Sequence, residues 1–91
     1  MAAIRDERHK KELILRLKRI EGQLRGIQAM IQEGEDCEKV AQQISAGRRA
    51  LDKAFFNVLA CAIQAEPPAG SAKPGADKRI KNAADLLARF G

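Results

Sequence analysis

The sequence predicts an all-α protein, a protomer of three helices whose two long helices pair with those of a second copy. Three observations lead to this prediction. Apolar residues recur at alternating spacings of three and four over two long segments, and Pro and Gly interrupt the chain where that spacing stops. A chain of 91 residues with 45% hydrophobic and 32% charged residues forms one globular domain, residues 1–91.

The first predicted helix covers residues 12–33 and follows a charged segment, residues 1–11, that is expected to be a flexible arm. Gly22 and Gly26 interrupt this helix at a cost of about 1 kcal/mol each relative to Ala, which indicates close backbone contact or a functional reason. Gly34 is expected to end this helix, since glycine is common just after a helix C-terminus. The apolar positions follow the 3.5-residue seam of a helix that packs on other helices: Leu13, Leu17, Ile20, Leu24, Ile27 and Ile31.

The second predicted helix covers residues 36–65, with Asp36 as its cap. A linker rich in Pro, Gly and Ala, residues 67–76, separates it from a short third helix at 77–90 that Asp77 is expected to cap. Both cysteines of the chain lie on the seam of the second helix, whose members are Cys37, Val40, Ile44, Gly47, Leu51, Ala54, Val58, Cys61 and Ala65.

A hairpin of two such helices leaves half of each apolar face open, so we expect an antiparallel four-helix bundle made by two copies. Cys37 and Cys61 are about 36 Å apart along one straight helix, because the rise is about 1.5 Å per residue. A disulfide needs Cα atoms within about 7 Å, which excludes a bond within one chain. If the helix crosses its twofold mate near Arg49, Cys37 of one copy lies level with Cys61 of the other.

The two thiols therefore form a candidate intersubunit pair. Cys37 lies in the first turn of its helix, where the helix dipole favours a thiolate, although Asp36 and Glu38 oppose that effect. Cys61 has an apolar setting, and both cysteines also fit the role of small buried hydrophobes. His9, the single histidine, lies in a charged arm and is expected to be exposed to solvent, so a tetrahedral zinc site within one chain is poorly supported.

A formal net charge of +5 and a pI near 9.6 favour a polyanionic partner, of which nucleic acid is the commonest. Seven basic residues fall mainly off the apolar seams and are expected to face outward, where they suit phosphate contacts, although each alone also fits a solvated helix face. They are Arg16, Lys18, Arg19, Arg25, Arg48, Arg49 and Lys53.

Other classes of protein find little support in the sequence. It contains no helix-turn-helix, zinc-finger or ribbon signature, and its three Phe residues offer little for base stacking. There is no Gly-rich phosphate loop and no catalytic set of Ser, His and Asp, so we expect no enzyme activity. No run of 18 apolar residues and no signal sequence occurs, so we expect a cytoplasmic protein that is not in a membrane.

Two segments, RLKRIEGQLRGIQAMIQEGEDC and VAQQISAGRRALDKA, closely resemble the copper-sensitive operon repressor (CsoR-like) family. Its members sense copper, nickel or cobalt, formaldehyde, or persulfides. The resemblance, which covers residues 12–66 well, implies a three-helix protomer, an antiparallel dimer and a dimer of dimers that binds double-stranded operator DNA. It also implies that Arg16 and Lys53 contact DNA and that Cys37 is the sensing cysteine.

Departures from the family pattern reduce the number of inducers that this chain is expected to sense. Copper sensors carry a histidine and a second cysteine where this chain has Ala62 and Glu66, so their Cys/His/Cys site is absent. Nickel and cobalt relatives use several histidines, whereas this chain has only His9. Formaldehyde sensors carry an N-terminal proline where Ala2 stands. Two thiols remain, as in the persulfide-sensing branch, although that branch places its second cysteine at the position of Glu66 rather than at Cys61.

The sequence thus predicts a DNA-binding repressor that releases its operator when Cys37 and Cys61 of two subunits react with persulfide or another reactive sulfur species or electrophile, without a cofactor. Two alternatives stay open. The first is a repressor of the same family that binds Cu(I) through Cys37 and Cys61. The second is a helical scaffold that binds an acidic protein and never touches DNA.

Overall fold

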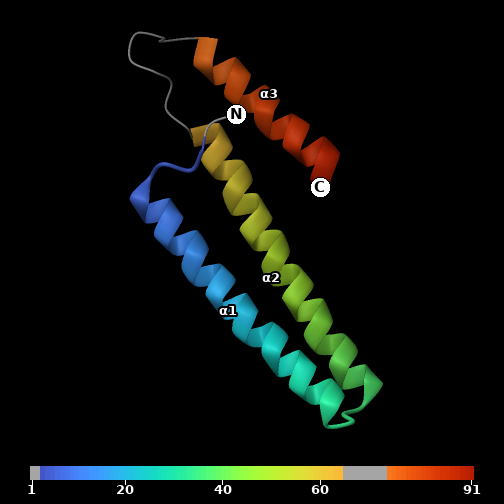
Figure 1. The fold of residues 1–91 in the computed structure, drawn as a ribbon. Helices are drawn as coiled ribbons and strands as arrows, with labels where there is room; N and C mark the ends of the chain where they lie inside the picture. The colour runs from blue at the N-terminus through green and yellow to red at the C-terminus, as the bar shows by residue number, and fades with distance from the viewer. Residues whose placement is uncertain (1–2, 65–73) are drawn as a thin grey trace.

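The computed structural model describes residues 3–64 and 74–91, which form three helices and, over those residues, no strand. The helices are α1 (Glu7–Gln32), α2 (Cys37–Gln64) and α3 (Pro74–Phe90). Figure 1 shows α1 and α2 as a long antiparallel hairpin, with α3 beside the C-terminal half of α2. The predicted all-α fold class is therefore confirmed. In the described part of the chain, no helix has a stretch long and apolar enough to cross a membrane.

Helix α1 begins at Glu7, five residues before the predicted start, so five of the eleven residues of the segment 1–11 are helical rather than part of a flexible arm. Asp6 explains the difference, because its carboxylate caps the helix. One Asp6 oxygen accepts hydrogen bonds from the backbone N–H of Arg8 at 2.8 Å and of His9 at 3.2 Å. These bonds satisfy two of the backbone donors that a helix start leaves without partners. They also hold the pKa of the Asp6 carboxyl below its usual value.

The turn between the long helices follows the sequence prediction closely. Gly34 has a φ of 74°, in the left-handed region that glycine enters without a steric penalty. Its N–H donates to the carbonyl of Ile31, and the N–H of Glu35 donates to that of Met30. Asp36 then caps α2, because its carboxylate accepts from the N–H of Glu38 at 3.1 Å. Four residues, 33–36, thus reverse the chain and set the antiparallel hairpin.

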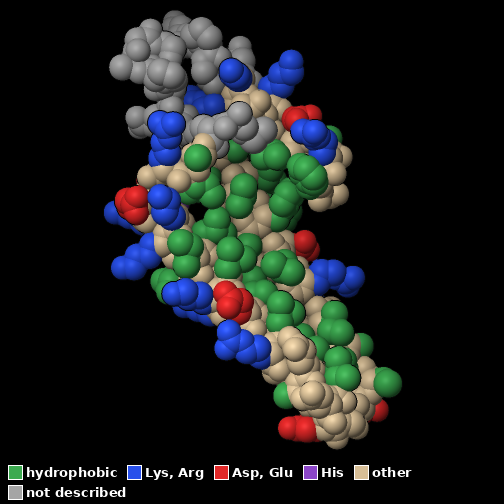
Figure 2. All heavy atoms as spheres, in the orientation of Figure 1, with side chains coloured by type: hydrophobic (Ala, Val, Ile, Leu, Met, Phe, Trp, Pro, Cys, Tyr) green, Lys and Arg blue, Asp and Glu red, His purple; other side chains and the backbone are tan. Residues whose placement is uncertain are grey.

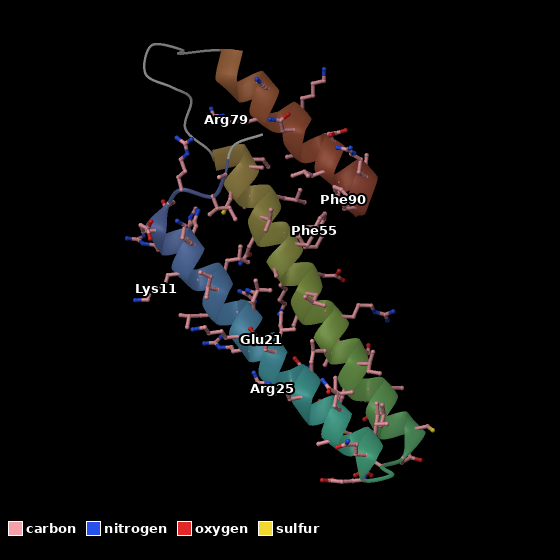
Figure 3. The ribbon with its side chains drawn as sticks, viewed as in Figure 1. Lys11, Glu21, Arg25, Phe55, Arg79 and Phe90 are labelled. Atoms are coloured by element: carbon pink, nitrogen blue, oxygen red, sulfur yellow. The ribbon has the colours of Figure 1, made fainter. Side chains whose placement is uncertain are left out.

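Helix α3 begins at Pro74, three residues before the predicted capping residue Asp77. Proline suits the first turn of a helix, since its fixed φ is helical and it lacks an N–H that would have no partner there. The predicted linker, residues 67–76, thus ends in helical residues, and the rest of it lies outside the described residues. Helix α3 packs against α2, and Phe55 points from α2 toward it (Figure 3).

The three helices form a single layer. The protomer measures 59 × 26 × 13 Å, and its smallest dimension is close to the diameter of about 10–12 Å of one helix with its side chains. Its radius of gyration is 17.4 Å, whereas a compact chain of this length has about 12 Å. Its accessible surface of 7271 Å² exceeds by roughly 2000 Å² what a compact 10.0 kDa protein exposes. One protomer therefore lacks the second layer on which a hydrophobic core depends.

The apolar seam of α1 is divided between the hairpin and solvent. Ile20 and Ile27 are 4% and 6% exposed against α2. Leu17, Leu24 and Ile31, seven residues apart on the same seam, remain 40–58% exposed. Figure 2 shows apolar side chains along the middle of the visible face, with Lys and Arg concentrated at the α1 edge. Among the described residues, the other buried apolar side chains are Ala54, Leu59 and Ala83.

The glycines of α1 and α2 do not make close contacts within the protomer. A Cβ atom added at Gly22 or Gly26 would meet no atom within 4 Å. The same holds for Gly47 on α2. Close packing of the hairpin therefore does not explain the two α1 glycines, contrary to one of the two sequence-based expectations for them.

Candidate functional site

The two cysteines lie at opposite ends of α2, and both are free thiols. Cys37 is the first residue of the helix and Cys61 lies three residues before its end at Gln64. Their separation of about 36 Å along the helix axis leaves each thiol in a different environment. The structure of one protomer does not bring the two thiols together.

Cys61 is half-buried and contacts His9 of α1. Its Sγ lies 3.4 Å from His9 Nδ1, and the thiol donates to this nitrogen in the tautomer whose proton is on Nε2. Burial raises the pKa of the Cys61 thiol, and the negative charge of Asp6 raises it further. His9 itself is half-buried, so the expectation that it is exposed to solvent is wrong.

This contact could not be predicted from local sequence patterns, because 52 residues separate the two side chains along the chain. The local signal that was available is Asp6, which has the residue type of a helix cap and is followed by the first-turn acid Glu7. With Asp6 recognised as the cap, the helix is predicted to begin at Glu7 and His9 is predicted to be helical. This signal would not have identified Cys61 as the partner.

Cys37 is exposed at the opposite end of the hairpin. It occupies the first turn of α2, beside the cap at Asp36 and next to Glu38, the acidic residue of that turn. A thiol there is accessible to a dissolved electrophile or metal ion. No other cysteine of the same chain is near enough to react with it.

The basic residues predicted to contact DNA are not all on the outer surface. Five of the six are exposed: Arg19, Arg25, Arg48, Arg49 and Lys53. Arg16 is half-buried, and its Nε is buried with no hydrogen-bond partner among the described residues. The expectation that this guanidinium faces outward is therefore wrong for the isolated protomer. Arg16 and Gln23 are seven residues apart, about two helical turns, so they lie on the same side of α1. Both are half-buried, which indicates that this side faces α2.

Two of the exposed arginines already have partners on their own helix. Arg25 forms an ion pair with Glu21 at 3.5 Å, and Figure 3 shows both side chains on α1. Arg49 donates to the hydroxyl of Ser45 at 3.4 Å. Exposed pairs of this kind contribute about 0–1 kcal/mol, so both guanidinium groups remain available to a phosphate.

The positions at which copper sensors of the resembled family carry further ligands offer little here. Ala62 is half-buried and has no donor atom, and Glu66 lies outside the described residues. Over residues 3–64 and 74–91, no group of three or more His, Cys, Asp or Glu side chains is arranged to hold a metal ion. A metal site would thus need ligands from more than one protomer or from solvent.

Comparison with known proteins places these features in context. The sequence profile of a family described as "metal-sensitive transcriptional repressor" matches residues 9–89. The copper-sensing transcriptional repressor RicR of Mycobacterium tuberculosis is 40% identical over 80 residues, which is 82% of this chain and 80% of that protein. The copper-sensing transcriptional repressor CsoR of Bacillus subtilis is 38% identical over 55 residues, 60% of this chain and 54% of that protein.

A solved structure has the same fold. A variant of the formaldehyde-responsive regulator FrmR from Salmonella enterica serovar Typhimurium superposes with a TM-score of 0.76. The match covers 94% of this chain and 98% of that one, at 24% sequence identity. The three-helix arrangement is thus that of a known regulator.

Proposed function

Because the chain belongs to the metal-sensitive transcriptional repressor family, we propose that it binds operator DNA as an oligomer and releases that DNA when Cys37 and Cys61 react. The family consists of transcriptional regulators, which confirms the expectation that the protein is not an enzyme. It also removes the support for a helical scaffold without DNA binding. The observation that carries the proposal is the placement of two free thiols at opposite ends of one long helix.

The shape of the protomer supports an antiparallel dimer. A layer 13 Å thick with exposed residues on a regular seam requires a second layer. A second copy laid antiparallel across α2 supplies that layer. Residue 49 lies midway between residues 37 and 61, so a twofold axis near Arg49 brings each Cys37 level with Cys61 of the other copy. Two such dimers would form the proposed tetramer.

The exposed cations support binding to the DNA backbone. Arg19, Arg48 and Lys53 carry no ion pair among those described, and repetition by symmetry multiplies their charge. Each phosphate contact contributes about 0.9 to the slope of log K against log salt. We therefore expect Arg48→Gln to reduce that slope by about 0.9 for each phosphate that Arg48 neutralises. Lys39→Gln serves as the control, because Lys39 is not among the predicted DNA contacts and pairs with Glu35 of the turn that precedes α2.

The DNA experiment is fluorescence anisotropy with an operator duplex and a scrambled duplex over a series of salt concentrations. Tighter binding to the operator, with the slope reduced by Arg48→Gln and unchanged by Lys39→Gln, supports the proposal. Weak binding of equal strength to the operator and the scrambled duplex would contradict the proposal and favour a helical scaffold that does not act on DNA.

For the inducer, we propose a reactive sulfur species. The exposed Cys37 thiolate takes one sulfur from a polysulfide, which leaves one atom shorter, and becomes a persulfide. The Cys61 thiolate of the second copy then attacks the Cys37 sulfur, and a hydrosulfide ion leaves as the disulfide forms. The half-buried setting of Cys61 suits a resolving thiol, because bulk solvent has limited access to it.

Intact mass under non-reducing conditions tests this chemistry before and after treatment with a polysulfide donor. We expect the wild type to form a covalent dimer and Cys61→Ala to stop at the persulfide monomer. Operator release by polysulfide should be lost in the same variant. Release that is unchanged in Cys61→Ala, without a covalent dimer, would refute the two-thiol mechanism.

The second candidate inducer is Cu(I), for which two relatives with copper-sensing names provide the support. Cys37 and Cys61 of two copies would supply soft thiolate donors, the class of ligand that Cu(I) prefers. Competition with a Cu(I) chelator under anaerobic conditions should then give one ion per cysteine pair. Operator release by Cu(I), together with no response to polysulfide, would select this candidate.

A further inference from the structure

The contact between His9 and Cys61 has no role in a mechanism that uses thiols alone. It joins the first turn of α1 to the last part of α2, and both side chains are half-buried. A thiolate and an imidazole are two of the protein ligands that bind soft and borderline metal ions. The pair therefore provides one sulfur and one nitrogen donor at a single place in one protomer.

The backbone holds the imidazole in position. His9 lies in the capped turn of α1, and its own N–H donates to the Asp6 carboxylate. The cap thus fixes the part of the helix from which the ring reaches α2. Because a helix position carries this ligand, its approach to Cys61 does not depend on a mobile loop.

The distance between the two donor atoms is slightly shorter than the separation of two ligands on one metal ion. With metal–sulfur and metal–nitrogen bonds of about 2.3 and 2.05 Å, a bond angle near 110° to 120° places sulfur and nitrogen roughly 3.5 to 3.8 Å apart. A linear arrangement would need roughly 4.3 Å. The observed 3.4 Å is close to the first range, so an ion of three or four coordination fits between the two atoms after a small movement.

We propose that His9 and Cys61 of one protomer together bind Cu(I), as a nitrogen and a sulfur ligand, with at least one coordination position left open. Thiolate is a soft ligand that favours Cu(I), whereas a structural zinc site takes four protein ligands and the described residues of one protomer offer no group of even three. This inference rests on the second candidate function, Cu(I) sensing, only for the identity of the metal ion. Cys37 of the second copy is the candidate for a third ligand, because the proposed twofold axis places it level with Cys61.

The test is Cu(I) affinity of the full chain in anaerobic competition with a chromogenic chelator, combined with X-ray absorption at the copper edge. His9→Gln should weaken Cu(I) binding by about tenfold or more, because even groups that only orient a metal ligand contribute about 10–100-fold. The same substitution should remove the nitrogen scatterer from the copper spectrum. Lys10→Gln, at the neighbouring residue in the same turn, should change neither, and far-UV circular dichroism should show equal helix content.

The Cys37→Ser variant separates this inference from the sensing mechanism. We expect it to bind Cu(I) more weakly and to keep the nitrogen scatterer, because that ligand comes from the same protomer as Cys61. Wild-type affinity and an unchanged spectrum in His9→Gln would overturn the inference and leave thiol sensing intact. Binding that depends on His9 without any release of operator DNA would overturn copper sensing and support the ligand pair.

Discussion

Leu51 provides the sharpest test of the second layer that the flat protomer requires. It is 47% exposed on α2 and lies two residues from Arg49, where the proposed twofold axis crosses the helix. Both copies of Leu51 should therefore be buried at the same point of the interface. Truncation to alanine changes the two sides of that interface at once.

The magnitude follows from the exposed fraction. Full burial of a leucine side chain contributes about 1.5–3 kcal/mol, so burying the exposed half contributes roughly 1 kcal/mol per copy. Two copies together forfeit about 2 kcal/mol in Leu51→Ala, and the cavity left in the interface adds roughly 1 kcal/mol. We therefore expect the dissociation constant of the dimer to rise by about 100-fold, since each 1.4 kcal/mol is a factor of ten.

Sedimentation equilibrium over a range of protein concentrations measures this constant. Leu15→Ala is the matched control, because Leu15 is the same residue type, is also 47% exposed, and lies on α1 outside the spacing of Leu17 and Leu24. Its dissociation constant should stay within about threefold of the wild type. Equal shifts in both variants, or no shift in either, would refute the placement of the interface on this face.

Three further predictions concern single sites. At neutral pH, Cys61 should react with iodoacetamide more slowly than the exposed Cys37. Burial raises the pKa of the Cys61 thiol above its usual value of 9.0, so its reaction rate should keep rising above that pH. Peptide mass mapping over a pH series measures both rates. Gly22→Ala should stabilise the protein by about 1 kcal/mol in chemical denaturation, because its Cβ meets nothing within the protomer, and a loss of stability would instead reveal a neighbouring subunit backbone. The pKa of the Asp6 carboxyl is lowered in the folded protein, so the stabilisation of α1 by this cap is fully present above pH 3.8, its usual pKa, and is lost as the pH falls through the folded pKa. Hydrogen exchange, corrected for the intrinsic rate at each pH, should show that the His9 amide loses protection over that acidic range and not between pH 6 and 8.

Periodicity and turn residues were sufficient to predict three helices and the turn between α1 and α2, but not the residues at which α1 and α3 begin. The seam of α1 and the pair Gly34 and Asp36 are local signals, because each acts through spacing or through a backbone conformation within a few residues. The start of α1 was missed, since a run of charged residues resembles a flexible arm until the cap at Asp6 is recognised.

The candidate site was predicted less completely, for a physical reason. A seam marks which residues face inward, but it does not tell which half is buried within the protomer and which half remains for a partner. Ile20 is buried and Leu24 is exposed although both follow the same pattern. The contact between His9 and Cys61 and the burial of Arg16 Nε depend on how two helices lie against each other, which local spacing does not specify.

The placement of the two thiols also determines what a newly made chain does before it assembles. Within one molecule, the length of α2 keeps Cys37 out of reach of Cys61, so a solitary chain has no internal route to a disulfide. Premature oxidation therefore does not lock an immature subunit into a closed form. A cross-link between the two cysteines would report that two subunits have met, which makes it a direct measure of assembly in the cell as well as of the signal.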